Sequence, residues 1–440
     1  MASEMGLSVR GAGNVDAVLH RISAAVEERA KKDNPNIDLG TSENWVIRDE
    51  LVEFCKEAVR EGLIAKHLSY PDGFAGDSAL LEALAGFFNQ YFKPAVPVTS
   101  SHIATAPGGA ASLDALLYNI CEPGDGVLVP APFWNGFDWL FGVRSGVQPV
   151  AVTVPFEDTF TTNLIPCLID VLENSSRPIK ALVLTNPQNP FGQCYPRHVI
   201  EECIKFCDER KIHFISDEVY AVSQFSTGSF PNLVPFISAL SVDVKALGCD
   251  PSRVHVVWSI SKDFGSSGFR MGCCVTQANK AMQVGLALAA NTQMSSLTAI
   301  FTAALLSSPK LPSLLETNAI RLAEAYDTVV SFFTKRGIEY IPVSHGPFVF
   351  ARIAPSAASW EDESTAIACC KASGVILSSG RAYHVPESEK GWARLTFAIK
   401  RDQLDEALRR LDVGLELFRS KQANVPASIF VYLMHMYQNT

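Results

Sequence analysis

Four short runs of almost continuous apolar residues recur in the middle of the chain, between about residues 127 and 275. They are Val127-Leu-Val-Pro, Ala181-Leu-Val-Leu-Thr, His213-Phe-Ile-Ser and Val254-His-Val-Val-Trp-Ser. Each run ends in a polar or turn-rich segment, and helical stretches separate the runs. Buried parallel strands have this composition because helices cover both faces of their sheet. The pattern predicts an α/β fold with a mostly parallel sheet flanked by helices, in which ligands bind at the carboxyl ends of the strands.

The chain that follows this region predicts a second, smaller domain of mixed α+β structure. A long helix is expected from Leu311 to Gly337, then several strands, then a helix from Arg401 to Phe418. We therefore expect four parts, with no repeats and no long linker between them. They are residues 1–55, which pack with the small domain, residues 56–315, the large domain, residues 316–420, the small domain, and residues 421–440, an apolar tail. The tail is expected to dock as a helix on the protein or a partner subunit, with a membrane anchor as the alternative.

The composition argues against several classes of protein. Of 440 residues 48% are hydrophobic, and the net charge is −9 without any basic block, so binding to nucleic acid or a membrane surface is not expected. Neither a signal peptide nor an apolar stretch of about 18 residues is found. The 11 cysteines are scattered without a C-x-x-C pair. They are expected to be reduced core thiols in a cytoplasmic protein, without a metal site.

One segment carries several kinds of chemistry at once. Ser259-Ile-Ser-Lys-Asp-Phe-Gly-Ser-Ser-Gly-Phe-Arg-Met-Gly272 follows a predicted strand and combines a lysine, hydroxyls, glycines and an arginine. A partly buried Lys262 near cations would be the amine nucleophile that an aldehyde cofactor needs. The hydroxyls and Arg270 suit a phosphate, and the glycines let the backbone approach it. The alternative is an ordinary turn with a surface lysine.

Two polar segments follow neighbouring predicted strands. Asp217, in Ser216-Asp-Glu-Val-Tyr220, would need a cationic partner at the end of a buried strand, and a pyridinium nitrogen would be such a partner. Tyr220, and Asn189 of Asn186-Pro-Gln-Asn-Pro-Phe-Gly192, could donate hydrogen bonds to a phenolic oxygen of the same ring. The alternatives are a helix-capping aspartate and a plain loop.

Two further segments suit an anion and a planar ring. Ala106-Pro-Gly-Gly-Ala-Ala-Ser112 opens an apolar helix, where small residues such as Gly109 and Ala110 leave N–H groups free for an anion. It is not a P-loop, since no Gly-Lys-Ser/Thr follows. Trp134, in Pro132-Phe-Trp-Asn-Gly136, could stack on a ring, although an isolated tryptophan is more often a core residue.

Taken together, these motifs resemble those of the fold-type I class I and II aminotransferases, and within them the 1-aminocyclopropane-1-carboxylate synthase-like branch. The resemblance covers roughly residues 37–418 and implies pyridoxal phosphate as cofactor, an amino-acid substrate and a homodimer with a shared active site. It implies the following roles: Lys262 as Schiff-base lysine and proton shuttle; Asp217 at the pyridine nitrogen; Tyr220 and Asn189 at the phenolic oxygen; Ser259, Arg270, Gly109 and Ala110 at the phosphate; Trp134 on the ring; Arg394 at the substrate carboxylate; and Tyr70 at the phosphate of the neighbouring subunit.

The reaction itself is less constrained than the cofactor. Leu39-Gly-Thr-Ser-Glu-Asn44 resembles the branch's Gly-Leu-Ala-Glu-Asn and places Glu43 near the substrate. Phe74 and Phe133-Trp-Asn depart from the tyrosines of the branch, which argues against cyclopropane synthesis. Synthase-like chains include fungal carbon–sulfur lyases of secondary metabolism, so we expect an external aldimine that loses its α-proton and then eliminates sulfur from a cysteine-type conjugate. The alternatives are an aminotransferase, a 1-aminocyclopropane-1-carboxylate synthase and a non-catalytic binding protein of the same fold.

Overall fold

The centre of the molecule is a seven-stranded sheet. The computed structural model describes residues 6–17, 36–226, 234–290 and 294–423. The strand order is β2 (Ile103–Ala106), β8 (Gly272–Val275), β7 (Val254–Ser259), β6 (His213–Asp217), β5 (Ile179–Thr185), β3 (Gly126–Ala131) and β4 (Gln148–Thr153). Neighbouring strands are parallel except where β8 pairs with β2 and β7. The predicted α/β fold with a mostly parallel sheet is therefore confirmed.

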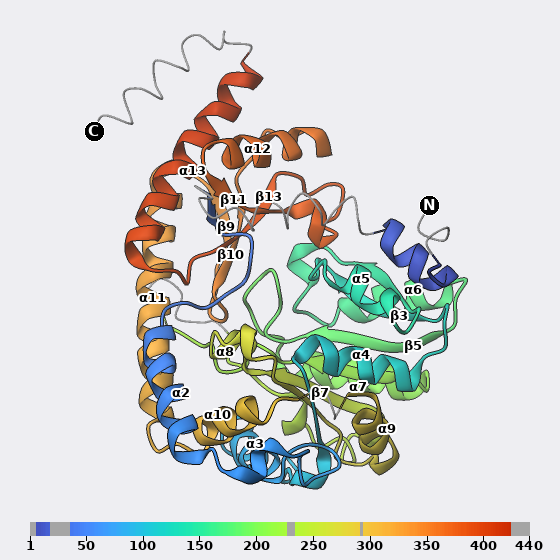
Figure 1. Cartoon of the computed structure of the whole chain (residues 1–440). Helices are drawn as coiled ribbons and strands as arrows, with labels where there is room; N and C mark the ends of the chain where they lie inside the picture. Colours follow the sequence, from blue (N-terminus) through green and yellow to red (C-terminus); the bar gives the residue numbers. More distant parts are fainter. Residues whose placement is uncertain (1–5, 18–35, 227–233, 291–293, 424–440) are drawn as a thin grey trace.

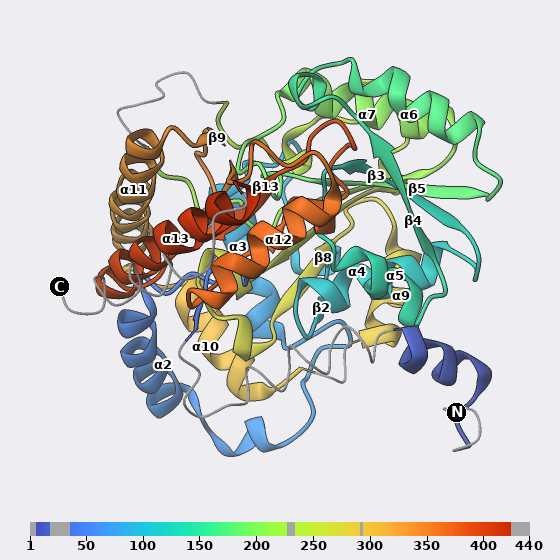
Figure 2. The ribbon, with the colours of Figure 1, turned by 90° about the horizontal axis from the view of Figure 1, so that it is seen from above.

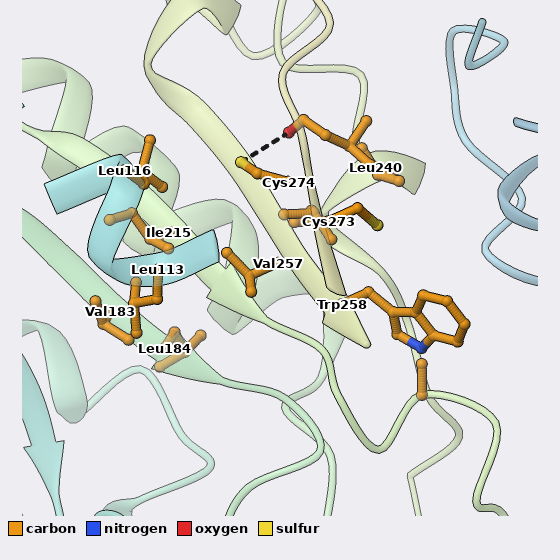
Figure 3. Packing of buried hydrophobic residues seen from close by; sticks show 14 of the residues in the cluster. Leu113, Leu116, Val183, Leu184, Ile215, Leu240, Val257, Trp258, Cys273 and Cys274 are labelled. Carbon is orange, nitrogen blue, oxygen red and sulfur yellow. Dashed lines mark hydrogen bonds between the residues drawn. The ribbon is translucent and has the colours of Figure 1, made fainter. Parts of the chain in front are cut away.

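Helices cover both faces of this sheet, as Figure 2 shows. One group contains α4 (Gly109–Ile120), α5 (Phe137–Val143) and α9 (Lys280–Ala290), and the other contains α6 (Leu164–Glu173) and α7 (Arg197–Glu209). Figure 3 shows Leu113 and Leu116 of α4 beside Val183, Ile215 and Val257 of three successive strands. These side chains are at most 2% exposed, which explains why the strands are apolar on both faces.

A smaller antiparallel sheet lies beside the first, with the order β12 (Ser378–Ser379), β13 (Trp392–Thr396), β10 (Phe348–Arg352) and β9 (Glu339–Ile341). It has its own apolar cluster, together with α11 (Leu311–Arg336) and α13 (Arg401–Gln422), and α12 (Trp360–Ala372) packs on α13 (Figure 1). The two predicted helices of this region are present. The first ends at Gly337, whose φ of 64° makes a left-handed cap, and the second continues four residues beyond Phe418.

Two further helices connect the N-terminal part with the large sheet. They are α2 (Arg48–Gly62) and α3 (Ser78–Tyr91), and both pack against α10 (Ser296–Leu306). Before them, β1 (Ile37–Asp38) pairs in parallel with β11 (Val375–Ile376). The expectation that all of residues 1–55 pack with the small domain is wrong for the helix over residues 9–17. There the Asn14 amide donates a 2.8 Å hydrogen bond to the Val143 carbonyl of α5.

The predicted apolar tail lies outside the described residues from residue 424 onward. Within the described part of the chain, none of the helices has the length and apolar character needed to cross a membrane.

The cysteines are all present as free thiols, and only Cys55, Cys167 and Cys249 are even partly exposed. Burial raises the pKa of each of these three thiols. It also raises the pKa of the Cys121 and Cys274 thiols to about 12. The chain thus holds its thiols in the protonated form, which is the less nucleophilic one.

Candidate active site

The carboxyl ends of the central parallel strands meet the start of α4, the segment 38–42 and the small sheet at one cavity of 540 Å³. This is the place where open α/β sheets bind their ligands. The cavity is lined by ten of the residues that the sequence predicted for the site: Gly109, Ala110, Trp134, Asn189, Asp217, Tyr220, Ser259, Lys262, Arg270 and Arg394. Residues from five separate sequence motifs, together with Arg394, therefore converge on one space.

Lys262 lies on the short helix α8 (Ile260–Asp263), immediately after β7. Burial lowers the pKa of its amine to about 8, and the positive charges of Arg394 and Arg270 act in the same direction. Nζ donates a 2.6 Å hydrogen bond to the backbone carbonyl of Ser42. An amine with this pKa is neutral in an appreciable fraction of molecules near pH 7 to 8, so it can attack an aldehyde and accept a proton.

Asp217 ends β6 with one carboxylate oxygen unpaired. Among the described residues, Oδ1 has no hydrogen-bond partner, and burial raises the pKa of the carboxyl to about 7. Its neighbour Glu218 is also buried, but it accepts hydrogen bonds from the Ser216 and Ser238 hydroxyls and the Ala239 N–H. A buried, unpaired carboxylate is costly unless a cation meets it. A protonated pyridine nitrogen fits this position.

Backbone and guanidinium groups form a cradle at the start of α4, which we call the phosphate cradle: Gly108, Gly109, Ser259 and Arg270. Gly108 has a φ of 100°, and a Cβ there would overlap the Arg270 guanidinium. Arg270 is fixed by hydrogen bonds of 2.7 Å to the Ser267 carbonyl and 2.8 Å to the Pro107 carbonyl. A cation beside the N-terminus of a helix, with glycines that admit close approach, suits a phosphate.

Arg394, on β13, is only 3% exposed and faces the same cavity. Nη1 donates to Asn189 Oδ1 at 3.0 Å and Nη2 donates to the Gly40 carbonyl at 2.6 Å. Nε has no partner among the described residues, so this buried guanidinium keeps a donor for an incoming acceptor. The Tyr383 and Phe348 rings lie 5.2 and 4.9 Å from it. A substrate carboxylate would complete its hydrogen bonding.

Two predicted site residues do not line the cavity. Glu43 accepts hydrogen bonds of 2.8 Å from the Ser267 hydroxyl and from Arg48. Burial opposes ionisation of Glu43, but these two donors hold its pKa below the ordinary value. Tyr70 is 87% exposed, on the surface between α2 and α3. Its contact with a neighbouring subunit stays a prediction.

Sequence reasoning missed several polar residues of the cavity, among them Ser42, Ser378 and Tyr383. The sequence did contain a signal for Ser42, because Thr41-Ser42 puts two hydroxyls where the synthase-like branch has Leu-Ala. Ser378 and Tyr383 carried no such signal. They come to the site only because β12 pairs with β13 beside Arg394.

Comparison with known proteins agrees with this geometry. Residues 35–411 match the family model for aminotransferase class I and II. A protein of Aspergillus oryzae, probable aminotransferase aclI, is 58% identical over 93% of this chain and 98% of its own length. Probable aminotransferase gliI of Aspergillus fumigatus is 36% identical over 93% and 96%. A solved Thermus thermophilus aspartate aminotransferase, a single mutant, superimposes with a TM-score of 0.73 at 23% identity, covering 93% of this chain and 99% of that one.

The fold, the lysine at the end of β7 and the cradle at α4 define a pyridoxal-phosphate enzyme of fold type I. The chain belongs to the class I and II aminotransferase family.

Proposed function

We propose that the enzyme eliminates a thiol from a cysteine-type conjugate in secondary metabolism. The observation that carries the proposal is the arrangement of Lys262 and Arg394 in a cavity that has an apolar wall beside its polar groups. The apolar and aromatic lining residues are Leu113, Trp134, Phe137, Trp139, Leu140, Ile376 and Leu377. Such a wall suits an uncharged thioether substituent, while Arg394 holds the single α-carboxylate.

Pyridoxal phosphate, when bound, acts as an electron sink for the α-carbon of the amino acid. Arg394 would orient the substrate by its carboxylate, and Lys262 Nζ would take the α-proton. The electron pair of that C–H bond forms a Cα–Cβ double bond as the Cβ–S bond breaks. Sulfur leaves with the bonding pair as a thiolate, which takes the proton from Lys262 Nζ and is released as the thiol. Water then hydrolyses the released 2-aminoacrylate to a 2-oxo acid and ammonium.

Relatives support the metabolic setting of this proposal. A relative of Aspergillus terreus that is 35% identical over 87% of this chain is named as a trimodular acetylaranotin synthesis protein, and this chain covers 39% of its length. We place the enzyme in the same kind of metabolism. We also propose a cytoplasmic location and a homodimer in which Tyr70 reaches the phosphate of the second subunit.

The test is incubation of the purified enzyme with S-substituted cysteines, with thiol and 2-oxo acid measured together. Equal amounts of both products, absent with Lys262→Ala, are expected. A wild-type enzyme that carries the absorption band of bound pyridoxal phosphate but releases neither product would overturn the elimination. Lys56→Ala, an exposed lysine paired with Glu53, serves as the matched control.

Transamination is the second candidate, because the relatives aclI and gliI are both named as aminotransferases. It predicts that an amino acid alone converts the enzyme to its pyridoxamine form, with one 2-oxo acid per site and no thiol. Formation of 1-aminocyclopropane-1-carboxylate from S-adenosylmethionine would instead support the synthase.

A further inference from the structure

Ser42 contacts both Tyr220 and Lys262, the two groups in the cavity that are placed to donate or accept a proton. Its side-chain oxygen lies 3.2 Å from the Tyr220 hydroxyl, and its backbone carbonyl accepts the 2.6 Å hydrogen bond from Lys262 Nζ. The residue is only 5% exposed. None of the motifs described above assigns Ser42 a role. It lies about 180 residues before Tyr220 in the sequence.

The position of Ser42 is set by the residues before it. Asp38 accepts hydrogen bonds from the Gly40 N–H at 2.8 Å, the Thr41 N–H at 3.0 Å and the Thr41 hydroxyl at 2.7 Å. On the other side, the Thr396 hydroxyl donates to the Thr41 carbonyl at 3.0 Å. We call residues 38–42 the covering segment. Since both of its sides are anchored, the Ser42 hydroxyl is presented to Tyr220 with little freedom.

We propose that Ser42 is a positioning residue that acts through Tyr220, donating its hydroxyl proton to the phenol oxygen so that the phenol proton turns toward the cofactor ring. A tyrosine hydroxyl has one proton to donate. If that proton goes to the ring oxygen, the contact between the two hydroxyls is satisfied only when Ser42 is the donor. A phenol that accepts a hydrogen bond is also the stronger donor. This inference rests on the cofactor site of the proposed function.

The charges around the two hydroxyls agree with a hydrogen bond that Ser42 donates and Tyr220 accepts. Burial raises the pKa of Tyr220, while Arg394 and the hydrogen bond from Ser42 act the other way. The charged or titratable groups that face Tyr220 or Lys262 from the surrounding elements are Arg394, Asp217, Tyr383, Glu43 and Arg270. A Ser42→Ala substitution leaves all of them in place, so a change in titration would report the lost hydroxyl.

The experiment is a spectrophotometric pH titration of the holoenzyme, with the midpoint of the cofactor's absorption change as readout. Ser42→Ala is expected to raise this midpoint by about half a pH unit, the size of a weakened hydrogen bond to a charged acceptor. Ser364→Ala is the matched control, because it also removes a serine hydroxyl, one that donates to the Trp360 carbonyl on the exposed side of α12, far from the contacts of Tyr220 and Lys262. It is expected to keep the wild-type midpoint.

A double-mutant cycle with Tyr220→Phe makes the assignment specific. If Ser42 acts through Tyr220, adding Ser42→Ala to Tyr220→Phe produces no further shift. An equal shift in both backgrounds, an unchanged midpoint in Ser42→Ala, or the same shift in Ser364→Ala would overturn the proposal. A wild-type protein without any absorption band at reconstitution would instead refute the cofactor site, and so the proposed function itself.

Discussion

The phosphate cradle and the covering segment meet in one cavity but are built in different ways. The cradle depends on particular residue types: the glycine Gly108 and the guanidinium of Arg270, with a further glycine, Gly272 of β8, packed against it. A Cβ at Gly272 would overlap the backbone of Gly108 and Gly109. The covering segment contributes mainly the carbonyls of Gly40 and Ser42. Cofactor binding therefore depends on residue identity, whereas substrate handling depends on where a backbone is held.

Lys262→Ala gives the largest expected effect and tests whether the chemistry of the cavity depends on residue identity. Thiol release should fall by about a thousandfold or more, because a positioned general base contributes about 10² to 10⁴ to the rate. Product formation and cofactor absorbance are the measurements, with Lys56→Ala beside them. Activity within a few fold of wild type would show that another group removes the α-proton.

Asp217 allows a prediction on stability that tests a second residue of the cofactor site outside the phosphate cradle. In the folded apoprotein burial raises the carboxyl pKa to about 7, above its value of about 3.9 in an unfolded chain. The folded state thus favours the protonated carboxyl. The contribution of Asp217 to the unfolding free energy is therefore complete below about pH 4 and is lost as pH rises through about 7. Relative to Asp217→Asn, the unfolding free energy of the apoprotein should fall by up to about 1.4 kcal/mol per pH unit in that window.

Denaturant unfolding of both apoproteins at several pH values measures this difference. Glu218 and Asp263 also have pKa values raised to about 7, and both are present in each protein. Asp263 cancels, and Glu218 cancels apart from the part of its raised pKa that the charge of Asp217 causes, the last of the causes of that shift. With pyridoxal phosphate bound, the ring nitrogen favours the ionised carboxylate of Asp217. The fall in unfolding free energy with rising pH should therefore disappear. Parallel pH curves for wild type and Asp217→Asn apoprotein would contradict the assignment.

Asp38→Asn tests the covering segment alone. An amide at this position cannot accept all three hydrogen bonds from Gly40 and Thr41, so the segment should be held less firmly. We expect kcat/KM to fall about tenfold, equivalent to about 1.4 kcal/mol, with an unchanged cofactor spectrum. Asp362→Asn is the control, because its carboxylate also accepts three hydrogen bonds, from the Ala358 and Ser359 N–H groups and the Ser359 hydroxyl at the start of α12. Loss of the cofactor band in Asp38→Asn would remove the distinction between the two regions.

The smallest effect is expected from Tyr70→Phe, which tests whether the cradle extends across a subunit boundary. Loss of one hydrogen bond to the phosphate should weaken cofactor affinity about fivefold, without a change in melting temperature. Titration with pyridoxal phosphate measures the affinity, and sedimentation reports the oligomeric state. Tyr118→Phe, at another exposed tyrosine, is the control. Unchanged affinity in a dimeric Tyr70→Phe protein would assign this surface tyrosine no part in the site.

The fold and the cradle could be predicted because their causes are local. Continuous apolar runs indicate buried strands, and the functional side chains lie within a few residues of the strand ends, as Asp217 and Lys262 do. The covering segment could not be predicted in this way. Its contacts join residues 178 to 355 positions apart, and its backbone carbonyls have no residue-type signal. Glu43 shows the same limit, since only the structure reveals its pairing with Arg48 and Ser267.

The burial of the cysteines has a practical consequence for measuring thiol release. A colorimetric disulfide reagent reports thiolates, and it would normally also consume the eleven thiols of the enzyme. Here the thiol pKa values are raised even at the partly exposed Cys55, Cys167 and Cys249. The folded protein should therefore give a slow, small background, and a continuous assay with such a reagent would follow the released product in real time.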